Sequence, residues 1–343
     1  MTWQRKRLGP RPTMNDYAAP LWLPGGHLQT IWPALFGPLR LPQAPYRRER
    51  WDTPDGDFID VDWQQGTPSQ TLLVLFHGLE GSSASHYAMA FADFARRQGF
   101  AFAVPHFRGC SGELNRGPRA YHSGDFEEIG WILARLRQQH QGPLLAVGVS
   151  LGGNALLRWA EEMGEQAARV VTALASVSAP LDLAASGRAI GQGLNRLIYT
   201  RRFLRTMKPR ALQKLAQHPG LFKADALHAV RDLYEFDNVF TAPLHGFRNT
   251  EDYWARASAK PHLQQIRVPT LLLNARNDPF VPAACLPQQP ANAWVSLWQP
   301  EQGGHVGFPG GSFPGHIRTL PQAAGGWLAA HIPKPPPRQD AHG

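Results

Sequence analysis

The chain alternates short apolar runs with amphipathic segments from residue 71 to about residue 180, and this alternation restricts the fold more than any other feature. The apolar runs are typical of strands that are buried on both faces. They are TLLVLFHG (71–78), FAFAVPHFRG (100–109), GPLLAVGVS (142–150) and VVTALASVSAP (170–180). The segments between them have helical spacing, as in the stretch where Phe126, Ile129 and Leu133 share one face. Strands that alternate with crossover helices predict an α/β protein with a mainly parallel central sheet and helices on both faces.

Other segments flank or interrupt this alternation. RRERWDTPDGDFIDVDWQQG (47–66) predicts a hairpin around Pro54-Asp55-Gly56. After residue 180 the pattern turns helical and irregular, and two more strands follow only at VPTLLLNARND (268–278) and AWVSLWQPEQ (293–302). An insertion of this size predicts a helical cap over the carboxyl ends of the sheet, where open α/β sheets bind ligands. The predicted units are an N-terminal arm packed on the body (1–45), the first part of the core (46–180), the cap (181–262), the second part of the core (263–332) and a disordered tail (333–343).

Composition narrows the class of protein. A chain of 343 residues that is 43% hydrophobic can bury a full core. No apolar stretch is long enough for a membrane span or a signal peptide, so we expect a cytoplasmic protein. Cys110 and Cys285 lie far apart without paired spacing, which argues against a zinc site and for reduced thiols. We therefore expect no metal and no cofactor.

The stretch Gly148-Val149-Ser150-Leu151-Gly152 joins an apolar strand directly to a predicted helix. Glycines at such a junction could serve only to let strand and helix pack closely. The same pattern is the nucleophile elbow, in which small flanking residues let a strained serine stand clear of the sheet edge. We favour the catalytic interpretation because partners for the serine follow in the chain.

A serine hydroxyl needs a base, and the base needs an orienting carboxylate. Asp278 lies just past the strand in LLLNARNDPFVP, and His305 lies in the glycine-rich loop of EQGGHVGF after the next strand. Serine, acid and histidine then follow in the order that an α/β-hydrolase requires. Alternatives remain open at this point. They are Asp232, Asp237 and Asp252 for the acid, and His316 for the base, with His331 and His342 in the terminal helix and tail.

Hydrolysis through a serine also needs two backbone donors for the developing oxyanion. The amide of Leu151, directly after the nucleophile, is one candidate. The other is the amide of Leu79 in HGLEGSS, which follows the strand 71–78. His77 then shapes that turn and does not itself catalyse.

The net charge of +9 is concentrated in RLIYTRRFLRTMKPRALQK (196–214), which holds seven Lys and Arg and no acid. No nucleic-acid-binding motif accompanies it, so we expect no nucleic acid partner. The segment could instead dock weakly on an anionic membrane as a lid. We favour an ordinary packed cap helix, and the sequence does not define the oligomeric state.

From about residue 20 to residue 330 the chain resembles the YheT-type branch of the α/β-hydrolase superfamily. The stretches that carry the resemblance are GGHLQTIWP, LFHGLEGSSASHY, HFRGCSGE, YHSGDFEEI, GVSLGGNALLRW, EFDNVFTAPLHGF, DYWARAS, NARNDPFVP and GGHVGF. Members are described as carboxylic-ester or acylglycerol hydrolases, and animal relatives act on monoacylglycerols and phospholipids. The resemblance implies Ser150, Asp278 and His305 as a triad. We expect two departures from the family: no amino-terminal membrane anchor like that of the animal relatives, and His106 at a position where the relatives should have an asparagine.

These observations predict a serine hydrolase that cleaves carboxylic esters of small molecules, such as short- or medium-chain acylglycerols, through an acyl-enzyme. An acyltransferase, a thioesterase or a peptide amidase could use the same elbow. A binding protein that keeps the fold without the chemistry is the alternative from a different class.

Overall fold

The computed structural model describes residues 17–37, 41, 45–64 and 70–333. Its centre is an eight-stranded sheet of order β1-β2-β4-β3-β5-β6-β7-β8, in which β1 and β2 pair antiparallel with their neighbours and all other pairs are parallel. The strands are β1 (Arg47–Asp52), β2 (Phe58–Gln64), β3 (Leu72–Phe76), β4 (Ala101–Pro105), β5 (Leu144–Val149), β6 (Ala173–Val177), β7 (Thr270–Leu273) and β8 (Val295–Trp298). The predicted parallel sheet and the predicted hairpin are both confirmed.

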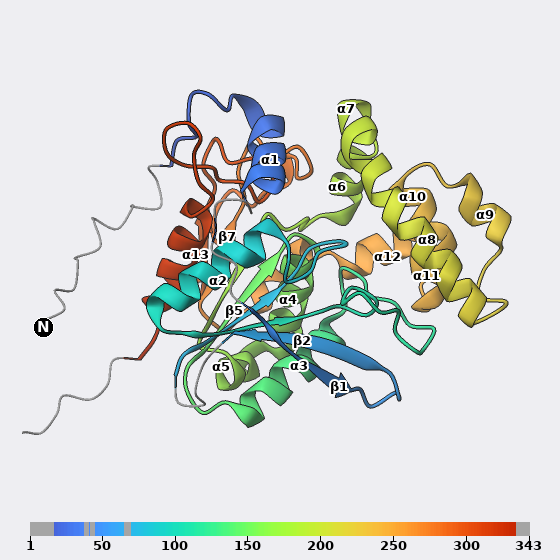
Figure 1. Cartoon of the computed structure of the whole chain (residues 1–343), viewed down its shortest axis with the longest axis horizontal. Helices are drawn as coiled ribbons and strands as arrows, with labels where there is room; N and C mark the ends of the chain where they lie inside the picture. Colours follow the sequence, from blue (N-terminus) through green and yellow to red (C-terminus); the bar gives the residue numbers. More distant parts are fainter. Residues whose placement is uncertain (1–16, 38–40, 42–44, 65–69, 334–343) are drawn as a thin grey trace, which may run out of the picture.

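Helices cover the sheet on both faces, as the alternating pattern predicts (Figure 1). On one face α2 (His86–Gln98) packs against α13 (Thr319–Ala329), and on the other α3 (Phe126–Gln139) packs against α4 (Leu151–Met163), with the short α5 (Ala167–Val170) beside them. Strands β3 to β6 are buried throughout their length because helices cover both faces of the sheet there. The sheet is therefore a rigid platform whose strand ends can hold side chains in fixed positions.

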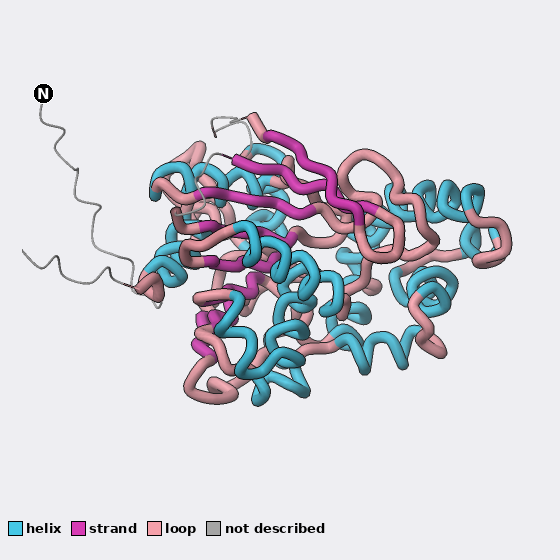
Figure 2. The backbone as a smooth tube through the Cα atoms, turned by 90° about the horizontal axis from the view of Figure 1, so that it is seen from below, coloured by secondary structure: helices cyan, strands magenta, loops and turns pink. Residues whose placement is uncertain are grey.

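Between β6 and β7 the chain leaves the sheet and forms a helical cap (Figure 2). The cap has its own small apolar clusters, one around Leu204, Leu227 and Phe236 and another around Leu183, Tyr253 and Trp254. Its helices are α6 (Leu183–Ile190), α7 (Gly193–Asn195), a π-helical turn (Arg196–Thr200), α8 (Arg201–Gln217), α9 (Ala224–Ala229), α10 (Leu233–Phe236), a second π-helical turn (Asp237–Thr241), α11 (Ala242–Leu244) and α12 (Thr250–Ala257). The cap thus has apolar clusters of its own, and hydrogen bonds such as that from the Ser123 amide to the Tyr253 hydroxyl connect it to the core.

One more helix, α1 (Gly25–Phe36), precedes the sheet and lies near the loops that follow β7 and β8 (Figure 1). The predicted disordered tail falls, apart from Pro333, outside the described residues. Within the described part of the chain, no helix has the length and apolar character needed to cross a membrane.

Candidate active site

Ser150 occupies a sharp turn between the end of β5 at Val149 and the start of α4 at Leu151. Its backbone has φ +53° and ψ −118°, a strained conformation for a residue with a side chain. The turn is tight because a Cβ on Gly148 would lie 2.5 Å from the carbonyl oxygen of Gly152, and one on Gly152 would lie 2.5 Å from that of His77. Positions 148 and 152 therefore have no room for a side chain. The strained turn between them places the serine hydroxyl at the end of the strand.

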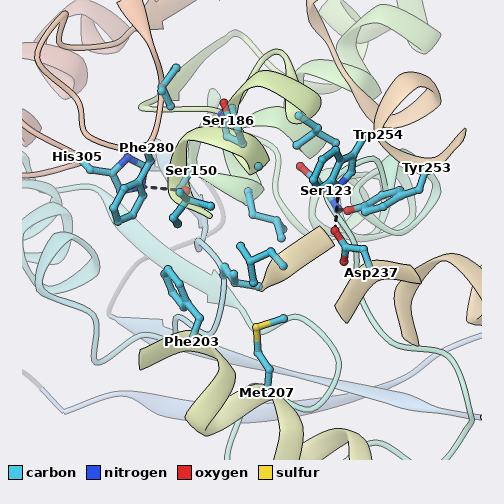
Figure 3. Close-up of a pocket in the computed structure, with 18 residues that line it drawn as sticks. Ser123, Ser150, Ser186, Phe203, Met207, Asp237, Tyr253, Trp254, Phe280 and His305 are labelled. Carbon is cyan, nitrogen blue, oxygen red and sulfur yellow. Dashed lines mark hydrogen bonds between the residues drawn. The ribbon is translucent and has the colours of Figure 1, made fainter. Parts of the chain in front are cut away.

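The side chains of His305 and Asp278 meet Ser150 at this strand end. His305 Nε2 lies 3.0 Å from Ser150 Oγ, and His305 Nδ1 lies 2.8 Å from Asp278 Oδ2. A carboxylate only accepts hydrogen bonds, so Nδ1 carries the ring proton and Nε2 is left to accept the proton of the serine hydroxyl. All three side chains that the sequence predicted as nucleophile, acid and base lie in one relay. Figure 3 shows the contact between His305 and Ser150.

Local turns hold the acid and the base in place. Asp278 is buried, and its second oxygen accepts from the amides of Phe280 (2.7 Å) and Val281 (3.2 Å), which orients the carboxylate toward His305. The ring of Phe280 packs on the imidazole, with centroids 4.1 Å apart. His305 follows Gly303 and Gly304, whose positive φ values let the loop bend sharply over the sheet end. The histidine side chain is 10% exposed, so it retains access to the cleft.

The alternatives left open by the sequence lie elsewhere. Asp232 caps α10 by accepting from the amide of Glu235, and Asp252 pairs with Arg248. His316 lies in a turn where its backbone pairs with that of Gly310. Asp237 opens into the cleft but has no hydrogen bond to an imidazole. None of these side chains joins the relay of Ser150 and His305 in the described part of the chain.

The turn after β3 carries the predicted donor Leu79. Neither the Leu79 amide nor the Leu151 amide has a hydrogen-bond partner among the described residues, and both residues line the cleft beside Ser150. His77 braces this turn, because its Nε2 accepts from the amide of Phe107 (3.0 Å) and its Nδ1 donates to the carbonyl of Gly78 (2.8 Å). Burial lowers the pKa of His77 to about 3, so the ring is neutral and structural.

His106, at which the chain departs from the family pattern, is also structural. It is buried, and its Nε2 lies 2.9 Å from Asp62 Oδ2 on β2, while its Nδ1 lies 3.3 Å from the carbonyl oxygen of Cys110. The ring therefore ties the turn after β4 to the neighbouring strand, and it makes no contact with the relay.

Sequence reasoning missed the contribution of α1. The side chain of Gln29 is fully buried, and its Oε1 accepts from Asn277 Nδ2 and from the amide of Gly303, each at 2.9 Å. The hydroxyl of Thr30 accepts from the amide of His305 at 2.8 Å. One helix thereby fixes both the loop with the acid and the loop with the base. The only signal in the sequence was an uncharged polar pair within an otherwise apolar short segment, GGHLQTIWP.

A cleft opens between this relay and the cap. Apolar side chains form most of its lining, including Leu183, Ile190, Phe203 and Met207 from the cap. A second cavity adjoins the cleft, since Leu79, Leu151, Met207, Asp237 and Tyr253 line both. The nucleophile thus faces an apolar space with few polar groups, as expected for a small-molecule site.

Known proteins share this organisation. A family model described as alpha/beta hydrolase fold matches residues 71–311. YheT of Escherichia coli (strain K12), named as a candidate esterase, is 40% identical over 315 residues, which cover 90% of this chain and 88% of YheT. Phospholipase ABHD3 of Mus musculus is 30% identical over 288 residues, covering 80% of this chain and 69% of that protein. Among solved structures, the esterase Pf2001 of Pyrococcus furiosus shares the fold, with a TM-score of 0.54, 16% identity and coverage of 84% of this chain and 91% of the esterase.

The chain therefore belongs to the α/β-hydrolase fold family. Within this family it is a hydrolase of the YheT type, because its similarity to YheT extends over nearly the whole of both chains.

Proposed function

We propose that this hydrolase cleaves carboxylic esters through an acyl-enzyme, with Ser150 as nucleophile, His305 as base and Asp278 as the carboxylate that orients the imidazole. The observation that carries the proposal is the relay itself, in which distances of 3.0 Å and 2.8 Å connect serine, histidine and aspartate at the wall of an apolar cleft. Nucleophile and base are within hydrogen-bond reach, and a third group orients the base.

In the first half of the reaction, Ser150 Oγ attacks the acyl carbonyl carbon while its proton moves to His305 Nε2. The carbonyl oxygen becomes an oxyanion, which accepts hydrogen bonds from the free amides of Leu79 and Leu151. Asp278 stabilises the imidazolium through the Nδ1 hydrogen bond. When the intermediate collapses, the ester C–O bond breaks and the proton on His305 Nε2 passes to the leaving alcohol. The acyl group remains on Ser150.

In the second half, His305 Nε2 takes a proton from water, and the resulting hydroxide attacks the acyl carbon. The same two amides hold the new oxyanion. Collapse breaks the bond to Ser150 Oγ, which regains its proton from His305, and the carboxylic acid leaves. None of these steps requires a metal ion or a cofactor.

The cleft lining supports an acyl chain as the group bound beside the nucleophile. Leu183, Ile190, Phe203 and Met207 offer an apolar surface that excludes water from a hydrocarbon tail. The names of two similar proteins, a candidate esterase and a phospholipase, point in the same direction. We therefore propose acyl esters such as short- or medium-chain acylglycerols as the substrate class.

Substitution of Ser150 by alanine tests this function. Because the triad acts as a unit, we expect turnover of p-nitrophenyl butyrate to fall about a millionfold in Ser150→Ala. A fluorophosphonate probe should label the wild type on Ser150 and should not label the variant. A variant that retains most of its activity would overturn the assignment, and an unlabelled wild type would favour a binding protein that has lost its chemistry.

An acyl-enzyme can also pass its acyl group to an alcohol or receive it from a thioester. Hydrolysis is distinguished from transfer by adding an alcohol acceptor during turnover. A new ester that forms faster than free acid would identify an acyltransferase, and faster release from acyl thioesters than from matched oxygen esters would identify a thioesterase.

Exposed side chains of residues 194–202, at the start of the basic cap segment, suggest that substrate reaches the cleft from an anionic membrane. Leu194 and Leu197 are 61% and 51% exposed, and the exposed Ile198, Arg201 and Arg202 adjoin them in the chain. Apolar side chains next to arginines are suited to the boundary of an anionic lipid surface. We infer that this face docks weakly on such a surface.

The inner face of the same segment connects this surface to the relay. Tyr199 packs on Phe280 with centroids 4.5 Å apart, and Phe280 packs on His305. Phe203, one turn further along, lines the cleft. If Leu194 and Leu197 enter a membrane, the membrane would therefore contact the same segment that carries Tyr199 and Phe203. An acyl chain would pass this segment on its way into the cleft.

Sedimentation with vesicles tests the docking surface. We expect binding to phosphatidylglycerol vesicles in low salt, weaker binding in high salt, and none to phosphatidylcholine vesicles. Arg202→Glu should weaken binding about tenfold or more, since each surface charge contributes about 1 kcal/mol. Arg169→Glu is the matched control, because Arg169 is exposed on α5, away from the cap in Figure 1. Absence of binding at every salt concentration would end the proposal.

A further inference from the structure

The cleft wall across from the nucleophile carries a carboxylate that ester hydrolysis does not use. Asp237 begins the π-helical turn Asp237–Thr241 and lines both the cleft and the adjoining cavity. Figure 3 shows it on the cap side of the cleft, with Ser150 and His305 on the other side. Its Oδ1 accepts from the Thr241 hydroxyl at 2.7 Å, and its Oδ2 accepts from the Trp254 indole at 2.8 Å.

This carboxylate has no counter-ion. No cationic side chain in the described part of the chain forms an ion pair with Asp237. Burial raises its pKa to about 6, in spite of the two hydrogen bonds that stabilise the charge. The Thr241 hydroxyl and the Trp254 indole bind different oxygens of Asp237, and an asparagine could not accept from both in this way because its amide has a single oxygen. A carboxylate accepts about four hydrogen bonds, and Asp237 has capacity left for a donor from a ligand.

Unused donors lie in the same cleft. The hydroxyl of Tyr253 accepts from the amide of Ser123 at 2.9 Å, and its own proton has no acceptor among the described residues. The hydroxyl of Ser186 is buried, lines the cleft and has no hydrogen-bond partner in the described structure. The next residue, Gly187, lies so close to Trp254 that a Cβ there would be 2.4 Å from the indole. The ring that binds Asp237 therefore also borders the helix that carries Ser186.

We propose that Asp237, together with Tyr253 and Ser186, forms a subsite that binds a hydroxyl group of the ester substrate. This inference rests on the proposed ester hydrolysis and narrows its substrate class to esters of polyols or of hydroxylated acids. A hydroxyl group both donates and accepts, so it satisfies the free acceptor of Asp237 and the free donors of its neighbours. An ammonium group only donates, so it could not accept the free hydroxyl proton of Tyr253.

Matched pairs of esters test the subsite. The first pair, glycerol monobutyrate and propyl butyrate, places the hydroxyls on the alcohol side, and the second, methyl 3-hydroxybutyrate and methyl butyrate, places one on the acyl side. We expect wild-type kcat/KM to favour the hydroxylated member of one pair by about 10- to 100-fold, which also identifies the side that occupies the subsite. A third pair, butyrylcholine and its neutral carbon analogue, tests a cationic ligand.

Variants connect the preference to these residues. Asp237→Asn should reduce the preference to within about threefold. Tyr253→Phe removes the free donor, together with the acceptor of the Ser123 amide, and should reduce the preference partly. Asp225→Asn is the matched control, because Asp225 is an exposed acid on α9 of the cap, and it should keep the full preference.

The outcomes separate the subsite from the proposed function. Fluorophosphonate labelling of Ser150 in each variant reports whether the relay is intact. A wild type that is not labelled refutes the hydrolysis and the subsite together. A labelled wild type that hydrolyses both members of the first two pairs equally, that keeps its preference in Asp237→Asn, or that prefers only the cationic ester refutes the subsite alone.

Discussion

The two walls of the cleft are held in place by different kinds of contact. On the core wall, the side chains of Ser150, Asp278 and His305 are fixed by backbone hydrogen bonds, by glycine contacts and by α1. On the cap wall, Phe203 lies in the 17-residue α8 and Asp237 in a π-helical turn, and both elements contribute side chains to an apolar cluster of the cap. The proposed reacting groups thus lie on the wall that the core forms, and the groups proposed to contact the rest of a substrate lie on the wall that the cap forms.

This division has a physical reason. Catalysis depends on distances between a few atoms, and small displacements lower the rate strongly. Substrate selection tolerates more movement, and a separately packed cap can change its lining without disturbing the relay. We therefore expect substitutions on the core wall to reduce turnover, and substitutions on the cap wall to change selectivity or stability.

Among the substitutions that compare the two walls, removal of the proposed base His305 should have the largest effect. His305→Ala leaves Ser150 without a proton acceptor, and kcat/KM for p-nitrophenyl butyrate should fall by at least about 10⁴-fold. His316→Ala is the control, since that ring lies outside the relay, and it should remain within about threefold of the wild type in the same assay. Equal losses in the two variants would contradict the assignment of the base.

Removal of the α1 contacts should have an intermediate effect. Gln29→Leu leaves the Asn277 amide and the Gly303 N–H buried without a partner, which should lower the free energy of unfolding by about 2 to 5 kcal/mol. Because both loops of the relay loosen, kcat should fall about tenfold with little change in KM. Urea unfolding and steady-state kinetics measure the two effects, with the exposed Gln166→Leu as control. An unchanged kcat would mean that α1 stabilises the fold without positioning the relay.

The substitution Asp237→Asn on the cap wall should raise the free energy of unfolding, by less than Gln29→Leu lowers it. The pKa of Asp237 is about 6 in the folded protein and near 3.8 in the unfolded chain, so the unfolded state ionises first as the pH rises. Above about pH 6 the carboxylate therefore destabilises the fold, by about 2 kcal/mol in a cleft that still admits some water. Asp237→Asn should be more stable than the wild type at pH 8 and should lose this advantage near pH 4. Urea unfolding at both pH values measures the difference, and a gain that does not depend on pH would contradict the cause.

Much of the fold and the candidate relay could be predicted because the signals are local. The apolar runs that became β3 to β6 are each interpretable within about ten residues. Ser150 was recognisable from its flanking glycines, and Asp278 and His305 from their places after two strands. The contacts of Gln29 could not be predicted, since its partner Asn277 is 248 positions away in the chain.

The cap is the part where prediction was least complete. Asp237 was one of several possible acids for the histidine, but it lies on the opposite wall with Trp254 and Thr241 as its donors. Lys214, counted among the seven cations of the segment 196–214, is buried and donates to three oxygens of Asn115 and Gly117. Helical periodicity marks the apolar face of such a helix, but it does not reveal which polar side chains a neighbouring loop will cover.

The sequence by itself determined the order of strands and helices, the strained turn at Ser150 and the requirement for glycine on either side of it. These features depend on backbone sterics and on neighbours within a few residues, which a single chain displays directly. Only the tertiary structure decided which acid meets His305, that α1 binds both loops of the relay, and that Asp237 faces the nucleophile across the cleft. Each of these depends on contacts between residues far apart in the chain, and those contacts form only when the sheet and the cap have packed.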